Sequence, residues 1–344
     1  MAHANISVFI PHMGCPHACS FCNQRTISDT AHAPTPDEAE EIIKGAYEHI
    51  TDPQKRSQTE IAFFGGSFTA IDRDYMTGLL AAAKKYTGEK GFCGIRISTR
   101  PDCIDEEILM LLKSYNVTAI ELGAQSMNDE VLRLNDRGHT ASDVENASRL
   151  IKAHGFELGL QMMVGLYGST QADELYTMRK IIALHPDTVR IYPVAVLAGT
   201  RLAELYKSGE YKLYPFEEAV RICGILYCAF TSCDIRVIRM GLHAEEGVGE
   251  NMIAGFYHPA FGELVRSEII KNVILKYYES QCKEGTCLEI SANKSLIGAV
   301  RGHKRSNRIY FSEKGLDLNI TEDNSLPSGT IRINEDMLNV FKIT

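Results

Sequence analysis

The chain has 344 residues, of which 44% are hydrophobic and 23% charged, so it can form one large globular domain and a small second one. Its formal net charge of −8 excludes a protein that coats nucleic acid through its overall charge, and any contact with RNA would need a local basic patch. No apolar run is long enough to cross a bilayer and the N-terminus has no signal-peptide pattern, so we expect no membrane partner and a reducing compartment, the cytoplasm, for the ten cysteines.

Short apolar runs alternate with amphipathic helical patterns over the first 240 residues. The runs that predict strands are 6–10, 61–64, 95–98, 117–122, 158–164, 189–194 and 235–240. Helices are predicted at 35–50, 73–86, 104–114, 140–154, 171–184 and 216–231. Continuous apolar strands between helices indicate a buried parallel sheet in an α/β fold. We expect a partial (β/α)6 TIM-like barrel or a full barrel, with a flat doubly wound sheet as the alternative.

The pattern changes near residue 241. A Gly-rich polar stretch leads to a helical stretch that ends near residue 280. The segments "CLEIS", "RIYFS", "LDLNI" and "TIRIN" then predict short strands. We therefore divide the chain into a barrel domain, 1–240, and a small α+β C-terminal domain, 241–344.

Three cysteines stand close together in "CPHACSFC", directly after the first predicted strand. The carboxyl ends of parallel strands are where α/β folds build their sites. A structural zinc site needs four ligands, so His12 or His17 would have to join Cys15, Cys19 and Cys22. A redox pair would use only the last two cysteines. An iron–sulfur cluster on three thiolates leaves one iron open for a small molecule, and the spacing favours this interpretation.

The Cys-x3-Cys-x2-Cys pattern, with Phe21 before the last cysteine, resembles the signature of the radical S-adenosylmethionine (SAM) superfamily. The resemblance implies a 4Fe-4S cluster held by Cys15, Cys19 and Cys22, with SAM on the open iron. It further implies reductive cleavage of SAM to methionine and a 5′-deoxyadenosyl radical, with electrons from a donor of the flavodoxin or ferredoxin type. The expected activity is that of a transferase or oxidoreductase.

Polar segments follow the later strands, among them "FFGGSFT", "STRPD", "ELGAQSMNDEVLRLNDRGH" and "QMMVGLYGST". Over residues 5–240 these stretches resemble the radical domain of the Elongator catalytic subunit family, and more loosely the oxygen-independent coproporphyrinogen oxidases. The resemblance places a Gly-Gly pair at the methionine amino group, an Arg at the carboxylate and Gln side chains near the ribose. The SAM-binding residues it implies are Gly65, Gly66, Ser67, Ser98, Gln125, Arg137, Gln161 and Val194.

The resemblance also implies that the substrate is a tRNA wobble uridine. We expect a stand-alone radical module, because the C-terminal part shows no coenzyme A loop of an acetyltransferase domain. One basic segment, 291–312, contains no acid and could contact RNA phosphates through Lys294, Arg301, Lys304, Arg305 and Arg308. Tyr310 and Phe311 could stack on a base. Two alternatives stay open: radical chemistry on a small metabolite or peptide, and a non-catalytic zinc-binding module.

Overall fold

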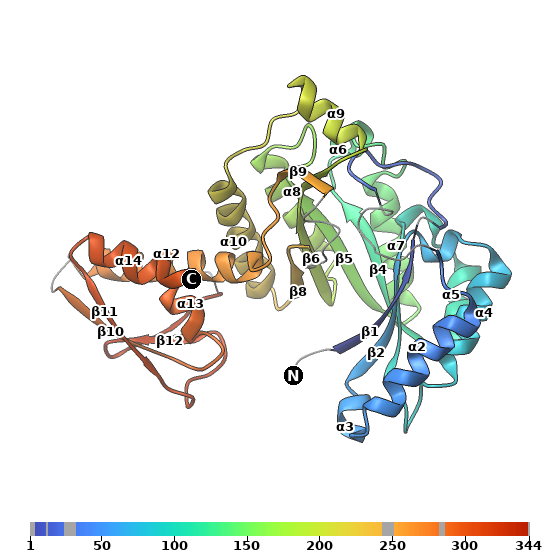
Figure 1. Ribbon diagram of the computed structural model, residues 1–344, viewed down its shortest axis with the longest axis horizontal. Coiled ribbons are helices and arrows are strands. Elements are labelled where there is room, and N and C mark those ends of the chain that lie inside the picture. The colour runs from blue at the N-terminus through green and yellow to red at the C-terminus, as the bar shows by residue number, and fades with distance from the viewer. Residues whose placement is uncertain (1–3, 12, 24–31, 243–250, 282–285, 343–344) are drawn as a thin grey trace.

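The computed structural model describes residues 4–11, 13–23, 32–242, 251–281 and 286–342. Its main element is a seven-stranded sheet in which every neighbouring pair is parallel (Figure 1). In spatial order the strands are β1 (Ala4–Ile10), β2 (Thr59–Gly65), β3 (Gly94–Thr99), β4 (Val117–Gln125), β5 (Glu157–Val164), β6 (Thr188–Pro193) and β8 (Arg236–Met240). Spatial order equals chain order, whereas a doubly wound sheet reverses direction at a switch point. The predicted partial barrel is therefore confirmed.

Helices cover the outside of the curved sheet, as right-handed crossovers in sequential order require (Figure 1). They are α2 (Pro36–His49), α4 (Arg73–Lys84), α5 (Glu106–Ser114), α7 (Ala141–Ala153), α8 (Gln171–Ala183) and α10 (Phe216–Ser232). Shorter helices are α3 (Pro53–Arg56), α6 (Asp129–Leu134) and α9 (Arg201–Ser208). The predicted capping box of α2 is present, since the side chain of Thr35 accepts from the Glu38 amide and Glu38 accepts from the Thr35 amide.

The two faces of the sheet differ in chemistry. Ile61, Ile97 and Leu158 are fully buried on the outer face and pack in the main hydrophobic core. The inner face carries Arg96 and Glu121, which are also fully buried. The expectation of continuously apolar strands is thus wrong for this face, because its charged side chains pair with one another instead of with water.

The C-terminal part forms a second, smaller sheet. Its strands are β10 (Cys287–Ala292), β11 (Asp317–Glu322), β12 (Thr330–Ile333) and β13 (Asp336–Asn339), in the order β11-β10-β12-β13. It carries α13 (Ile297–Arg301) and α14 (Ser306–Glu313), and α12 (Phe261–Ser280) packs against both α13 and α10. The division at residue 240 stays a prediction.

One strand prediction in this part is wrong. The segment 308–312 lies in α14, where Asn307 and Phe311, four residues apart, share the buried face. A further two-stranded antiparallel sheet, β7 (Ala195–Leu197) with β9 (Met252–Gly255), lies apart from the main sheet. Within the described ranges, no helix combines the length and apolar character that a membrane span requires.

Candidate active site

The cysteine loop follows β1 and is fixed by neighbouring segments. The backbone amide of Ser20 donates to the Asn135 carbonyl at 3.1 Å, and its hydroxyl to the Asn135 side chain at 2.7 Å. The Ser20 carbonyl accepts from the amide of Leu202 at 2.8 Å. The segment between Cys19 and Cys22 is therefore held between the end of α6 and the start of α9.

None of these three cysteines forms a disulfide; Cys15 is exposed, and Cys19 and Cys22 are half-buried. In the described part of the chain, no three His, Cys, Asp or Glu side chains are grouped so that they could hold a metal ion. His12 lies outside the described residues. The His17 ring lies against Gly138, where an added Cβ would come within 2.2 Å of it.

A buried guanidinium lies beside the cysteine loop. Arg137 is 7% exposed, and its Nη1 donates to the Cys19 sulfur at 3.1 Å. Its Nη2 donates to the Gly123 carbonyl at 2.6 Å, while the Arg137 carbonyl accepts from Arg100 at 2.6 Å. The guanidinium of Arg137 therefore joins the cysteine loop to the end of β4.

Gly65 and Gly66 bring the end of β2 against this loop. Gly65 has a φ of +121°, and a Cβ there would lie 2.2 Å from the Ile10 carbonyl oxygen. At Gly66 a Cβ would lie 1.9 Å from the Met13 carbonyl oxygen. The amide of Ser67 donates to the same Met13 oxygen at 2.9 Å. Any side chain at the Gly-Gly pair would therefore displace the backbone that leads into the cysteines.

The Ser67 side chain points away from this junction. It is fully buried, and its hydroxyl lies 2.9 Å from the Thr99 hydroxyl and accepts from the Arg100 amide at 3.2 Å. In this structure Ser67 therefore connects the ends of β2 and β3, and its hydroxyl is fully engaged with protein groups.

Several buried polar atoms near the loop have no protein partner within the described ranges. Among them are Oε1 of Gln125, at the end of β4, and Nε of Arg137. Gln125 also has a φ of +63°, a left-handed conformation that costs energy for any residue except glycine. An unpaired buried acceptor and donor are costly unless a ligand completes them. They fit a polar ligand such as SAM at this end of the sheet.

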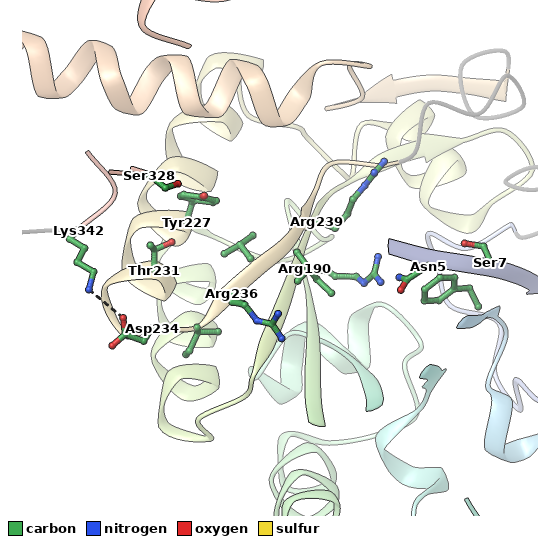
Figure 2. Close-up of a pocket in the computed structure, with 14 residues that line it drawn as sticks. Asn5, Ser7, Arg190, Tyr227, Thr231, Asp234, Arg236, Arg239, Ser328 and Lys342 are labelled. Atoms are coloured by element: carbon green, nitrogen blue, oxygen red, sulfur yellow. Dashed lines mark hydrogen bonds and ion pairs between the residues drawn. The ribbon is translucent and has the colours of Figure 1, made fainter. Parts of the chain in front are cut away.

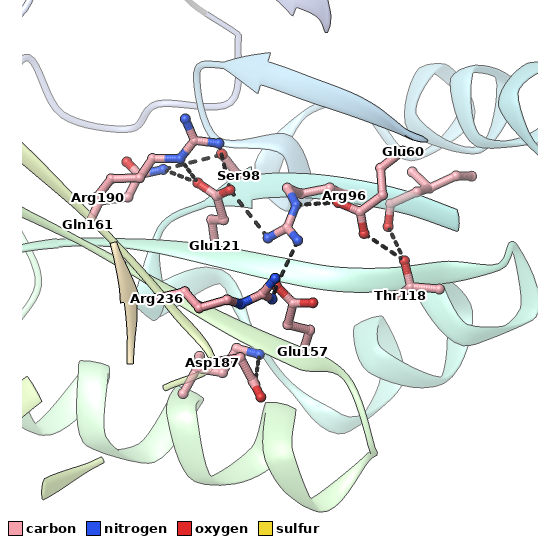
Figure 3. A network of polar contacts seen from close by, with 12 residues as sticks. Glu60, Arg96, Ser98, Thr118, Glu121, Glu157, Gln161, Asp187, Arg190 and Arg236 are labelled. Atoms are coloured by element: carbon pink, nitrogen blue, oxygen red, sulfur yellow. Dashed lines mark hydrogen bonds and ion pairs between the residues drawn. The ribbon is translucent and has the colours of Figure 1, made fainter. Parts of the chain in front are cut away.

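A network of charged side chains crosses the inner face of the sheet (Figure 3). Gln161 donates to Glu121 at 2.8 Å and to the Ser98 hydroxyl at 3.4 Å. Arg190 holds the same Glu121 with two hydrogen bonds, of 2.6 and 2.8 Å. The structure thus brings together Ser98 and Gln161, two of the residues predicted to contact SAM.

Arg96 lies at the centre of this network and is fully buried. Its guanidinium contacts Glu60 at 2.6 Å and Glu157 at 2.7 Å. A longer ion pair of 3.4 Å joins it to Glu121. Sequence reasoning missed Arg96 and Glu60, although charged residues inside predicted buried strands are a signal that paired groups face each other across the sheet.

Val194 lies in a different setting. Its side chain is fully buried in a second apolar cluster with Val131, Leu166 and Leu202. Its amide donates to the Val164 carbonyl at 2.9 Å, and its carbonyl accepts from the Phe256 amide at 2.8 Å. Both backbone groups of Val194 therefore already have partners.

The predicted RNA contacts lie in the C-terminal domain, around α13 and α14. All five are exposed: Lys294, Arg301, Lys304, Arg305 and Arg308. Phe311 is 1% exposed, so the prediction that it stacks on a base is wrong. Tyr310 is half-buried, with Lys271 at 5.2 Å and Lys314 at 5.1 Å from its ring centre.

Known proteins share this fold and these segments. Residues 9–181 match the Radical SAM superfamily, and residues 186–271 match the Radical_SAM C-terminal domain. The tRNA uridine(34) acetyltransferase of Methanocaldococcus jannaschii is 35% identical over 187 residues, which cover 48% of this chain and 34% of that protein. Elongator complex protein 3 of Homo sapiens is 31% identical over 185 residues, again 48% of this chain and 34% of that protein.

A solved structure of Elp3 from Methanocaldococcus infernus has a TM-score of 0.59 and 24% identity, covering 83% of this chain and 64% of that one. This likeness concerns the fold. The matched segment spans about a third of the length of the two curated relatives.

Proposed function

This chain belongs to the radical SAM superfamily and is one of its enzymes, and from that premise we propose that it modifies tRNA at a wobble uridine. The cofactors of the superfamily are a 4Fe-4S cluster and SAM. When bound, the reduced cluster would supply the electron for cleavage of SAM to methionine and a 5′-deoxyadenosyl radical. The electron would come from a protein of the flavodoxin or ferredoxin type.

In this proposal Cys15, Cys19 and Cys22, which this structure does not group for a metal ion, would come together to hold the cluster. The carrying observation is the hydrogen bond of 3.1 Å that Nη1 of Arg137 donates to the Cys19 sulfur, since it joins the cysteine loop to the buried polar atoms predicted to contact SAM. The unpartnered Nε of Arg137 and Oε1 of Gln125 would hydrogen-bond SAM, and the planar fork of Arg137 suits a carboxylate. Ser98 and Gln161 would bind SAM from the inner face, and the backbone at Gly65-Gly66 would approach it closely. Ser67 and Val194 would contribute less to SAM binding, because their polar groups already hydrogen-bond to other protein groups.

The tRNA substrate is supported by the names of the relatives and by the exposed basic patch on α13 and α14. Lys304 and Arg305 lie in the short turn between the two helices, with φ angles of +51° and +66°. Both side chains are exposed and could contact phosphates. A tRNA-modifying role would place the protein in the cytoplasm.

The first test is a comparison of the modified nucleosides of tRNA from cells with and without the protein. Loss of a wobble-uridine modification supports the proposal. An unchanged profile would instead favour a small metabolite or a peptide as the substrate.

The chemistry is tested with protein reconstituted with iron and sulfide without oxygen. The wild type should be brown and convert SAM to 5′-deoxyadenosine, and Cys19→Ala should lose both properties. A colourless protein that binds zinc through the same cysteines would exclude the radical reaction.

The RNA patch is tested by tRNA binding as a function of salt. The double variant Lys304→Ala/Arg305→Ala should bind more weakly, with a salt slope smaller by about 1 for each lost phosphate contact. Arg149→Ala, which removes an exposed positive charge on α7, is the matched control. Equal slopes for the double variant and the wild type would exclude the patch as an RNA contact.

A further inference from the structure

A cavity of about 850 Å³ lies where the half-barrel is open, between the edge strands β1 and β8 (Figure 2). Asn5 and Ser7 of β1 line one side, and Arg236 and Arg239 of β8 line the other. Residues of α10 and of the C-terminal domain complete the wall. Arg190 reaches the cavity from the inner face of the sheet, so the cavity is continuous with the charged network there.

The register of β8 places both of its arginines on this inner face. Arg236 pairs with Thr188 and Arg239 pairs with Arg190, because the register shifts by one residue between them. Without this shift, side chains three positions apart on a strand would point to opposite faces. The irregularity therefore directs Arg236 and Arg239 to the same side as Arg190, which is how bulges re-aim side chains.

The cavity wall is cationic although the whole chain has a net charge of −8. Four cations line it, Arg190, Arg236, Arg239 and Lys342, against one acid, Asp234. A concave surface of one charge sign raises the local concentration of anions.

These cations differ in how they are held. Asp234 contacts Lys342 at 3.3 Å, and Arg190 is held by Glu121. Arg239 donates to two backbone carbonyls of the following turn, at 3.0 and 2.9 Å. The Arg236 side chain is 58% exposed, and its contact to Glu157 is long, 3.4 Å. Arg236 is thus the cation best placed to turn to an incoming anion.

The remaining lining groups suit phosphate. Asn5, Ser7, Thr231 and Ser328 provide amide and hydroxyl donors. Guanidinium groups with neutral donors beside them are the usual partners of phosphate oxygens.

We propose that this cavity binds phosphate groups of the substrate, with Arg236 and Arg239 as their principal contacts. The proposal rests on the proposed function in that these phosphates are those of tRNA. Arg190 connects the cavity to the inner face, because it holds Glu121 and Glu121 accepts from Gln161. A phosphate bound here would be linked through Arg190 and Glu121 to Gln161, one of the side chains predicted to contact SAM, and would hold the substrate at the open side of the barrel.

The test uses the reconstituted enzyme and two probes, inorganic pyrophosphate measured by calorimetry and a fluorescent tRNA transcript titrated at several salt concentrations. Arg236→Gln and Arg239→Gln should each weaken pyrophosphate binding about tenfold. Each should also reduce the salt slope of tRNA binding by about 0.7 to 0.9. Arg236→Lys, which keeps the charge, should retain most of the slope, and Arg149→Gln on α7 should match the wild type in both assays. Thermal unfolding of each variant confirms that it is folded.

The outcomes separate this inference from the proposed function. The phosphate site would be overturned if both glutamine variants kept the wild-type affinity for pyrophosphate and the wild-type salt slope of tRNA binding. This holds whatever the nucleoside profile shows. The protein could instead bind pyrophosphate through Arg236 and not bind tRNA. That result would support a site for a small phosphorylated ligand and would count against tRNA as the substrate.

Discussion

Replacing Glu174 by glutamine should remove a pH dependence of stability that its burial creates. Glu174 on α8 is 2% exposed, and one carboxyl oxygen accepts from the Gly165 amide at 2.6 Å and from the Tyr214 hydroxyl at 2.7 Å. The other oxygen has no partner among the described residues. Burial is the largest effect, and it raises the pKa of Glu174 from 4.5 to about 7 despite these two hydrogen bonds.

The sign and size of the effect follow from this pKa. Between pH 4.5 and 7 the folded protein keeps a proton on Glu174 that the unfolded chain has lost. The free energy of unfolding therefore falls as the pH rises, by about 3 kcal/mol in total, and no penalty remains below pH 4.5. The amide of Glu174→Gln does not titrate. The difference in unfolding free energy, variant minus wild type, should thus rise by about 3 kcal/mol from pH 4.5 to pH 8.

The assay is urea unfolding followed by circular dichroism at several pH values, since the chain has no tryptophan. The variant and the wild type are compared at the same pH, so the contributions of all other titrating groups to the unfolding free energy cancel. Glu130→Gln is the control, because the Glu130 carboxyl is exposed and the neighbouring Arg133 lowers its pKa. The difference in unfolding free energy between Glu130→Gln and the wild type should therefore not rise with pH. A difference for Glu174→Gln that stays constant over the whole range would refute the reasoning, because it would mean that the buried carboxyl is ionised in the folded state.

Three further predictions concern the site and its supports. Arg96→Met leaves Glu60 and Glu121 buried without their shared cation, and should lower the unfolding free energy by about 3 to 5 kcal/mol in urea; a loss below about 1 kcal/mol would contradict a structural role for the network. Gly66→Ala should reduce iron incorporation per chain, because its Cβ would lie 1.9 Å from the Met13 oxygen, whereas Gly45→Ala, with no atom within 4 Å, should incorporate iron normally. Arg137→Lys keeps the positive charge but loses the planar fork, so SAM affinity in equilibrium dialysis should fall about tenfold with iron content unchanged. If Arg137→Lys bound SAM as tightly as the wild type, the planar fork of Arg137 would be excluded as a SAM contact.

The sequence predicted the helices and strands of the barrel because their apolar residues form a regular outer face. Ile61, Ile97 and Leu158 alternate with inner residues, and the core they build is continuous. The segment 308–312 is a helix and not the predicted strand, because a short run of consecutive apolar residues fits a helix with one buried face as well as a strand. There, Phe311 packs inward and Ile309 is exposed.

The site was only partly predictable for a different reason. Cysteine spacing and Gly-Gly pairs are local in sequence, so the sequence alone suffices to propose Cys15 to Cys22 and Gly65-Gly66 as site residues. The partners of Arg96 come from three other strands, and only the register of the sheet brings them together. The orientation of the Ser67 hydroxyl likewise depends on Thr99, which lies 32 residues away.

The inner network changes character from its centre to the open side of the barrel. Arg96 is fully buried among three carboxylates, where the loss of hydration is large and only a complete set of partners can offset it. Glu157 is 27% exposed and Arg236 58% exposed, so at that end water reaches the ion pair and little energy is lost when it opens. The buried end therefore fixes Gln161 through Glu121, while the exposed end can exchange a protein carboxylate for a ligand phosphate. The same network of charged side chains thus orients the groups predicted to contact SAM and, at its exposed end, leaves Arg236 able to change its partner.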